Sequence, residues 1–406
     1  MPIEIVPFTG ESLRPWIDSG EIPFGGHVPE EAYVEWSELL ERERLLSALD
    51  GTRIVGTAAA FSFRLTVPGG ELPAAGVTAV AVLPTHRRRG ILRSMMRLQI
   101  DDVHARGEPL AILFASEPAI YPRFGYGLAS LSASFEIERT FAAFRDVPRP
   151  EGTVRLLTAD EAAVALPPVY DAIRRSQPGF YDRSETWWRT EVLGDAVFRR
   201  RGAGPQMLAL FEVDGAAEGY ARYRLKDEWD DRGPRFTLLV RELQATTDRA
   251  FRDLWRYLFD VDLVRTIHAA RQPPDPTLVL LLADPRRLGL TMADGLWVRL
   301  VDVRAALTGR GYPGAGSLVM EIDDAFCPWN SGRWRLDVSD SATLERTEAA
   351  PDLALVATDL GSAYLGGFSF SELARAGRVR ELRPGALMRA DALFATPRPP
   401  WCPQVF

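Results

Sequence analysis

One segment, residues 76–115, constrains the fold of this chain more than any other. Gly76–Leu83 is a largely apolar run typical of a strand, and Pro84 ends it. Arg88–Ala105 then places an apolar residue at every third or fourth position, as an amphipathic helix does; this face is formed by Leu92, Met96, Ile100 and Val103. Leu110–Ala115 is a short apolar run that predicts a buried parallel strand. This order predicts a right-handed βαβ unit and a chain of the α/β class.

The turn between the first strand and the helix is strongly basic. It contains Arg87-Arg88-Arg89-Gly90, and the helical pattern continues from it directly. The first N–H groups of a helix have no partner within the helix and carry the positive end of its dipole, so a phosphate group binds there readily. Gly90 allows close approach of the backbone, and the arginines supply charge. The turn is therefore a candidate pyrophosphate site, and the plainer interpretation is a solvated basic turn. Neither a Walker sequence nor the dinucleotide-binding glycine pattern is present.

Composition excludes several classes of protein. The chain has 406 residues with 48 Lys and Arg against 55 Asp and Glu, a formal net charge of −7, which argues against a nucleic-acid partner. Its apolar runs fall far short of the roughly 20 residues that span a bilayer, so we expect no membrane span. We see no signal peptide and expect a cytoplasmic location. The two cysteines, Cys327 and Cys402, form no disulfide framework, and the four histidines lack metal-ligand spacing, so we expect no metal.

The same order of elements recurs further along the chain. Residues 147–152 are proline-rich and indicate a linker. After them, Val240–Ala245 and Thr277–Leu282 are expected strands, with a helix between them at Asp248–Leu258. Strand, threonine-containing turn and amphipathic helix thus occur twice, which predicts an internal duplication. The second turn has neither the arginine cluster nor the glycine, so its phosphate chemistry would be lost.

From about residue 294 the pattern changes. Leu296–Leu307 has the spacing of a single helix. Further elements are expected in the order strand, strand, strand and helix, at Ser317–Ile322, Arg333–Val338, Leu353–Ala357 and Asp359–Leu365. The chain then ends in an extended, proline-rich tail with the apolar residues Trp401, Val405 and Phe406.

These motifs resemble those of a known family. The turn Arg87-Arg88-Arg89-Gly90-Ile91-Leu92 is similar to the acetyl-CoA pyrophosphate loop of the GNAT N-acetyltransferases. Ala79–Arg93, followed by Ala115-Ser116-Glu117 and Ile120-Tyr121-Pro122-Arg123-Phe124-Gly125-Tyr126-Gly127, resembles the Eis (enhanced intracellular survival) family of acetyltransferases. The resemblance runs the full length, through Leu296-Trp297-Val298-Arg299 and Gly361-Ser362-Ala363-Tyr364-Leu365-Gly366 to the terminal Phe406.

The resemblance implies a mixed α/β chain with two GNAT-like domains in tandem and a sterol-carrier-protein-like C-terminal domain. We expect these domains at residues 1–147, 148–293 and 294–406, the second GNAT domain being degenerate. It further implies a homo-hexamer that uses acetyl-CoA as co-substrate and no metal. The implied acceptors are primary amines of small molecules, namely aminoglycosides, polyamines or lysine side chains.

Matching positions assign the residues of the site. Val80, Ala81 and Val82 would pair with the pantetheine arm of acetyl-CoA. The pyrophosphate would be held by Arg88, Arg89, Gly90, Ile91, Leu92 and Arg93, and the coenzyme slot would be lined by Ser116 and Glu117. Tyr121 matches the general acid, and the terminal carboxylate on Phe406 matches the general base. Trp36 is our candidate for the amine pocket, and Tyr126 is expected to pack.

The two catalytic assignments make different chemical demands. A tyrosine of pKa about 10 is a weaker acid than a thiol of about 8.5, so full proton transfer from Tyr121 to the leaving thiolate would be uphill by roughly 2 kcal/mol. A hydrogen bond in the transition state meets this demand. Proton transfer from an amine of pKa about 10 to a carboxylate of pKa about 3.5 would be uphill by roughly 9 kcal/mol. Burial of both groups brings the two pKa values closer and lowers this cost. The best-known members of the family that this chain resembles end with an acidic residue before the terminal Phe, whereas Val405 stands here. This removes a negative charge that would attract polycationic aminoglycosides.

We expect direct transfer in a ternary complex, because nothing marks Cys327 or Cys402 as an acyl carrier. Two alternatives remain. One is a lipid- or acyl-CoA-binding carrier with a relic acetyltransferase domain, and the other is a regulatory protein. The intact arginine turn together with Tyr121 favours the enzyme.

Overall fold

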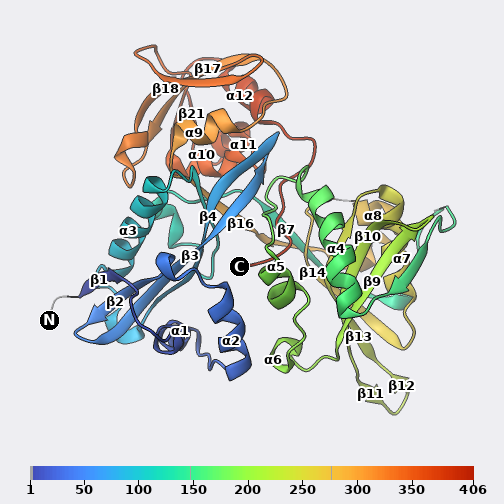
Figure 1. Cartoon of the computed structure of the whole chain (residues 1–406). Helices are drawn as coiled ribbons and strands as arrows, with labels where there is room; N and C mark the ends of the chain where they lie inside the picture. Colours follow the sequence, from blue (N-terminus) through green and yellow to red (C-terminus); the bar gives the residue numbers. More distant parts are fainter. Residues whose placement is uncertain (1–2, 147, 276) are drawn as a thin grey trace. The chain divides into compact units, whose positions relative to one another are not determined.

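The computed structural model describes residues 3–146, 148–275 and 277–406. They form two compact units (Figure 1). The first unit contains the chain up to Ser130, Gly295–Pro400 and Val405–Phe406, and the second contains Leu131–Asp294 and Trp401–Gln404. The predicted linker begins at Val147, which lies outside the described residues, as does the predicted domain boundary there.

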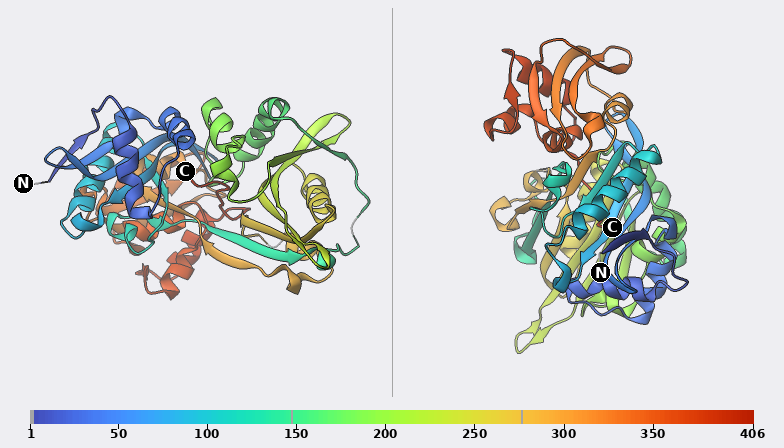
Figure 2. Two further views of the ribbon diagram at one scale, coloured as in Figure 1. Left: turned by 90° about the horizontal axis from the view of Figure 1, so that it is seen from below. Right: turned by 90° about the vertical axis from the view of Figure 1, so that its left-hand side faces the viewer.

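The first unit is built on a seven-stranded sheet. In spatial order its strands are β1 (Glu4–Pro7), β2 (Leu46–Asp50), β3 (Arg53–Val67), β4 (Gly70–Val82), β5 (Leu110–Phe114), β16 (Leu296–Leu300) and β6 (Gly127–Leu128). Helices α1 (Arg14–Glu21) and α2 (Glu30–Leu39) join β1 to β2, and α3 (Ile91–Ala105) joins β4 to β5. Because β4 and β5 are parallel, the predicted βαβ unit is confirmed. Helix α3, drawn in teal in Figure 2, lies along the blue strands. Its apolar face packs on these strands through Met96, Ile100 and Val103.

The two parallel strands separate part-way along their length. β4 pairs with β5 only over Ala74–Gly76 and Leu110–Ile112, although β4 continues to Val82. On its other side β4 stays paired with β3, with a bulge at Ala79, whose φ is 49°. A non-glycine residue rarely has positive φ, and a bulge redirects a strand. The separation leaves an opening at the carboxyl ends of β4 and β5, which is where open sheets bind ligands.

Helix α3 begins at Ile91 instead of the predicted Arg88. Arg88 and Gly90 have φ values of 63° and 80°, in the left-handed region. An α-helix cannot continue through such residues, so the basic turn stays outside the helix. The first turn of α3 and the end of β4 line the same cavity.

The rest of the first unit is a five-stranded sheet covered by helices, drawn in orange and red in Figure 1. Its strands in spatial order are β19 (Ala342–Arg346), β18 (Gly332–Val338), β17 (Gly316–Asp323), β20 (Leu353–Val356) and β21 (Arg380–Glu381). Its helices are α9 (Val303–Gly309), α10 (Ala357–Tyr364), α11 (Phe370–Arg375) and α12 (Ala386–Phe394). The predicted strands and helix of residues 317–365 are confirmed.

The prediction of a single helix over Leu296–Leu307 is wrong. Leu296–Leu300 is strand β16, in which every residue is buried, and Asp302 then starts α9 by accepting a hydrogen bond from the Ala305 N–H at 2.9 Å. A strand buried on both faces has no alternation of apolar and polar residues. The spacing of Leu296, Leu300 and Val303 therefore matched a helix by coincidence.

The second unit is built on another seven-stranded sheet. Its strands in spatial order are β15 (Thr291–Asp294), β7 (Leu131–Glu138), β14 (Val264–Gln272), β13 (Phe236–Ala245), β10 (Ala216–Lys226), β9 (Gln206–Val213) and β8 (Thr153–Leu156). β11 (Trp229–Asp230) and β12 (Gly233–Pro234) form a small hairpin, and the helices are α4 (Ala159–Arg174), α5 (Glu185–Trp187), α6 (Val197–Arg200), α7 (Asp248–Asp260) and α8 (Thr277–Leu281). β13, α7 and β14 repeat the order and the parallel pairing of β4, α3 and β5.

The predicted strand at Thr277–Leu282 is the helix α8, and the strand after α7 is β14 instead. In β14 the buried residues Val264, Ile267 and Ala269 face the core of the unit. Pro273 and Pro274 follow it and prevent its extension. A short apolar run such as 277–282 cannot be assigned to a strand or a helix by periodicity alone.

Candidate active site

The basic turn forms a cradle at the start of α3. Gly90 occupies the N-cap position with left-handed φ, and no side chain of the described residues caps this helix. The N–H groups of Ile91, Leu92 and Arg93 lie in the first turn, where no intrahelical partner exists. Arg88 and Gly90, on either side of Arg89, have left-handed φ, and successive backbone N–H groups in such a turn can form a concave anion site. The cradle therefore suits a pyrophosphate.

A cavity of about 660 Å³ connects this cradle to the opening between β4 and β5. All the predicted coenzyme-binding residues line it except Arg89, whose Nη2 instead donates to the Thr85 carbonyl at 3.3 Å. Further lining residues, which the sequence did not single out as coenzyme contacts, are Pro23, Phe24, His86, Arg87, Ile120, Arg123 and Phe124. Arg87 and Arg123 adjoin predicted residues, so the motifs held some signal for them. Pro23 and Phe24 come from a distant segment without a motif.

Tyr121 lies in the wall of this cavity. It begins the 3₁₀ helix η4 (Tyr121–Phe124), just after β5, and is 6% exposed. Burial raises the pKa of its phenol, and the negative charge of Glu117 adds to the effect. Tyr121 is therefore held in its protonated form, as a proton donor requires. Tyr126, which packs edge-on at 6.0 Å between ring centroids, is fully buried, and burial also raises the pKa of its phenol.

The turn that carries Tyr121 is supported by the last third of the chain. Gly125 ends η4 with φ of 85°, and a side chain there would overlap the guanidinium of Arg299 on β16. Arg299 is fully buried and pairs with Asp324 at 2.6 Å. The Thr358 hydroxyl, on α10, donates to the Pro122 carbonyl at 3.0 Å. Residues far apart in sequence thus fix the position of the phenol.

The terminal residue lies on the other face of the sheet. The Phe406 ring packs edge-on against Phe63 and Phe114, with centroid distances of 5.1 and 5.5 Å, and comes close to Gly76. Tyr121 belongs to the buried cluster that contains Val77 and the apolar face of α3. Successive residues of a strand point to opposite faces, so Gly76 faces away from that cluster. Tyr121 and Phe406 therefore lie on opposite faces of the sheet, at the place where β4 and β5 separate.

Trp36 and Phe406 are not among the residues that line the cavity. Trp36 is half-buried on α2, and its carbonyl accepts the Leu40 N–H that ends this helix. The structure thus brings together Tyr121 and the predicted coenzyme residues other than Arg89 in one cavity, with Phe406 across the sheet.

The second repeat does not keep this cradle. At the start of α7 the Thr247 hydroxyl accepts from the Ala250 N–H at 3.2 Å and donates to Glu218 at 2.7 Å. Arg249 is paired with the same carboxylate. The start of α7 is therefore capped by its own side chain beside a carboxylate, unlike the start of α3.

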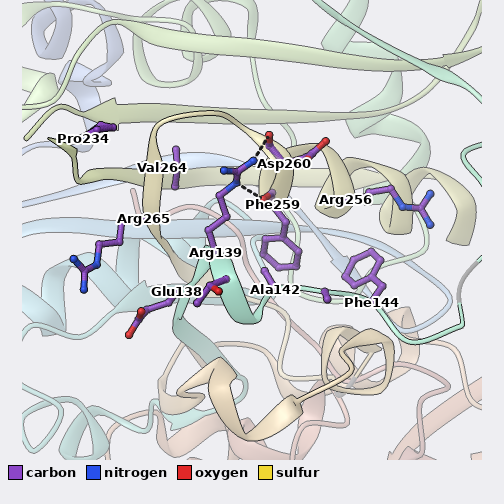
Figure 3. A pocket seen from close by; sticks show the side chains of 12 residues that line it. Glu138, Arg139, Ala142, Phe144, Pro234, Arg256, Phe259, Asp260, Val264 and Arg265 are labelled. Carbon is purple, nitrogen blue, oxygen red and sulfur yellow. Dashed lines mark hydrogen bonds and ion pairs between the residues drawn. The ribbon is translucent and has the colours of Figure 1, made fainter. Parts of the chain in front are cut away.

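A larger cavity, of about 840 Å³, lies within the second unit (Figure 3). It surrounds the carboxyl end of α7, where Arg139 donates to the carbonyls of Phe259 and Asp260 at 3.2 Å. These bonds satisfy the end of the helix. The described residues contain no cluster of three or more His, Cys, Asp or Glu that could hold a metal ion. In the described part of the chain, no helix is both long and apolar enough to cross a bilayer.

Comparison with known proteins finds three matching domains in the chain. Residues 4–129 and 179–300 each match an acetyltransferase (GNAT) domain, and residues 303–403 match a sterol carrier protein domain. An uncharacterized N-acetyltransferase from Streptomyces avermitilis is 46% identical over 397 residues, which is 96% of each protein. N-acetyltransferase Eis from Mycobacterium tuberculosis is 36% identical over 391 residues, 93% of this chain and 92% of that protein. The crystal structure of Eis1 from Mycobacterium abscessus is 36% identical, with a TM-score of 0.87 over 100% of both chains.

Proposed function

Because the chain belongs to the Eis family of GNAT N-acetyltransferases, we propose that it transfers the acetyl group of acetyl-CoA directly to primary amines of small molecules. The observation that carries this proposal is the single cavity that joins an unfilled helix N-terminus, the opening between β4 and β5, and a buried tyrosine. We further propose that the division of the sequence into residues 1–147, 148–293 and 294–406 reflects its three domains.

We assign the proposed coenzyme-binding roles according to where each residue lies along the cavity. Val80, Ala81 and Val82 would pair with the pantetheine arm, because β4 has no strand beside it beyond Gly76 on that side. The pyrophosphate would be held by Arg88, Gly90, Ile91, Leu92 and Arg93, with Arg89 at the rim, and Ser116 and Glu117 would line the slot beyond β5. The thioester would then lie in the opening, beside Tyr121.

The proposed reaction uses both faces of the sheet. A neutral amine attacks the thioester carbon, the C–N bond forms, the C–S bond breaks, and the coenzyme leaves as a thiolate that accepts a proton from Tyr121. The carboxylate of Phe406 accepts the proton of the attacking ammonium, directly or through water. Placement of the acid and the base on opposite faces supports this reaction, because Tyr121 can protonate the leaving thiolate on one side while the base takes the proton of the amine on the other.

The acceptor is proposed as an aminoglycoside, a polyamine or a lysine side chain, with Trp36 lining the amine pocket. Val405 is 41% exposed and uncharged, so acceptors of low charge are favoured over polycations. A homo-hexamer, a cytoplasmic location and the absence of a nucleic-acid partner remain predictions.

The decisive experiment is a thiol-release assay with acetyl-CoA and a panel of aminoglycosides, polyamines and lysine peptides. We expect release of one thiol for each acetylated amine, identified by mass spectrometry of the product. Tight coenzyme binding without thiol release for any amine would contradict the proposal. Retention of a lipid in that case would favour the carrier function that the sterol carrier domain match suggests.

A further inference from the structure

The second repeat contains its own pair of separating strands, and we propose that the opening between them is a binding seat for the C-terminal tail of the chain, which presents the terminal carboxylate for catalysis. β13 and β14 pair in parallel as far as Val240 and Ala269, and each strand then continues beyond this point. Trp401–Gln404 belong to this unit. The presenting role rests on the proposed function, whereas the seat itself does not.

Trp401 is the main anchor of the tail. It is 6% exposed, and its backbone N–H donates to the Pro178 carbonyl at 3.0 Å. Its indole Nε1 donates to the Arg271 carbonyl at 3.1 Å, and its ring packs edge-on against Phe180 at 5.2 Å. A Cβ on Gly179 would lie 2.6 Å from the Trp401 carbonyl oxygen. Glycine at that position thus allows the close approach of the two backbones.

The backbone of Arg271 is shaped to receive this indole. The pairing of β14 with β7 is regular up to Ala269, opposite Phe135, and resumes only at Gln272, opposite Ala133. Within this bulge Arg271 has φ of 52°. A non-glycine residue in the left-handed region costs energy, so its surroundings must hold it there. Here the bulge interrupts the ladder where the Arg271 carbonyl accepts the Trp401 indole.

Gln404 makes a second attachment. Its backbone carbonyl accepts from the Tyr181 hydroxyl at 3.4 Å, and its Oε1 accepts from the Trp187 indole Nε1 at 3.3 Å. Both partners belong to the segment that also provides Pro178 and Phe180. One wall of the seat is therefore continuous in sequence.

Cys402, between the two anchors, lies close to both separating strands. It is 2% exposed, and burial raises the pKa of its thiol to about 12. Glu242 of β13 and Arg271 of β14 also influence this thiol, and both residues lie beyond the last pair of the parallel ladder. The tail thus occupies the opening itself.

The seat explains why a repeat that cannot hold pyrophosphate retains separated strands. The start of α7 is capped by Thr247 and Glu218, so the opening is free to take a peptide. Val405 and Phe406 follow the seat at once. Ordering of Gln404 limits the conformations of the last two residues and so favours one position of the terminal carboxylate.

The test compares Trp401→Ala and Trp401→Phe in the full chain, with Trp229→Phe as the matched control. Trp229 belongs to the same unit but is 63% exposed and packs against Phe236, away from the tail. We expect backbone hydrogen exchange in residues 401–406 to become at least about tenfold faster in Trp401→Ala, because the local opening of the tail becomes easier. With an amine accepted by the wild type, kcat should fall by about 10- to 100-fold with the KM for acetyl-CoA unchanged. Trp401→Phe keeps an aromatic ring but loses the indole N–H, so its exchange rates and kcat should lie between those of the wild type and of Trp401→Ala.

Wild-type exchange rates in Trp401→Ala would overturn the seat. Faster exchange with full kcat, in an enzyme that loses turnover when Phe406 is removed, would overturn the presenting role. A chain that keeps full turnover without Phe406 would instead refute the base assignment of the proposed function and with it the presenting role. The exchange rates would then decide the seat independently.

Discussion

At the scale of single residues, Tyr121 carries the most specific chemical prediction. Tyr121→Phe removes the proposed proton donor and keeps the buried ring, so we expect turnover to fall by roughly 100-fold or more. The dissociation constant of acetyl-CoA, measured by calorimetry, should stay nearly unchanged. Tyr126→Phe is the matched control, because the buried Tyr126 hydroxyl has no hydrogen-bond partner in the described structure. Equal effects of the two substitutions on turnover would exclude Tyr121 as the acid.

Substitution of Gly90 tests the predicted pyrophosphate site at the start of α3. Its φ is 80° and a Cβ there would meet no atom within 4 Å, so Gly90→Ala imposes backbone strain without a clash. We expect a severalfold rise in the KM for acetyl-CoA with little change in kcat, because the N–H groups of the first turn shift.

Gly107→Ala provides the control for that strain. Gly107, at the other end of α3, has φ of 71° and equally open surroundings. The two variants should lose similar thermal stability, and only Gly90→Ala should alter the KM. An equal rise of the KM for acetyl-CoA in both variants would mean that the pyrophosphate does not bind at the start of α3.

At the scale of helices and strands, the pattern of apolar and polar residues predicts features whose residues are adjacent in sequence. The strand, the basic turn and α3 are adjacent in sequence, so their order could be predicted from the residues, and the cavity at the start of α3 lies where the pyrophosphate site is predicted. β16 was misassigned because a strand buried on both faces lacks alternation, and α8 because a short apolar run fits either type of element. The support of Tyr121 by Arg299 and Thr358 could not be predicted, because it depends on contacts between distant segments.

The buried charges of β13 give a prediction about pH. Glu242 has a fully buried carboxylate paired at 2.9 Å with both Arg183 and Arg222. Burial alone would raise the pKa of Glu242, but the two guanidinium groups lower it to about 2. A carboxyl whose pKa is lower in the folded state stabilises the fold above the unfolded pKa of 4.5. That contribution, on the order of 3 kcal/mol, is lost as the pH falls from about 4.5 to about 2.

Glu242→Gln should therefore weaken the acid dependence of stability in that window. Urea unfolding at several pH values between 2 and 7, followed by tryptophan fluorescence, measures this dependence of the free energy of unfolding on pH. We also expect lower stability at pH 7, because two buried guanidinium groups lose their partner. Glu212→Gln is the control, because Glu212 pairs with the exposed Arg155 at the edge of the same sheet. An unchanged acid dependence in Glu242→Gln would mean that other carboxyl groups control unfolding.

At the scale of the whole molecule, the two repeats differ at the start of the helix that follows the first strand of each. The first keeps an uncapped α3 and an opening lined by Tyr121, whereas the second caps α7 with Thr247 and its own carboxylate. The sterol-carrier-like part contributes Thr358 beneath the Tyr121 turn, and the chain ends at the first sheet with Phe406. We therefore expect activity to depend on the full chain, although the proposed coenzyme residues all come from its first third.

The terminal carboxylate gives the sharpest test of that dependence. Removal of Phe406 moves the carboxylate by one residue, about 3.3 Å along an extended chain, and deletes the ring that packs on Phe63 and Phe114. We expect turnover to fall by about 100-fold or more, because a base displaced by this distance no longer reaches the attacking amine. Amidation of Phe406 by protein ligation keeps the ring and removes only the charge, so it should cause a comparable loss with the tail still ordered. The ligated protein with a free carboxylate is the control for the procedure. Full turnover of the amidated enzyme with any accepted amine would show that the proton leaves by another route, even if deletion of Phe406 were damaging through lost packing.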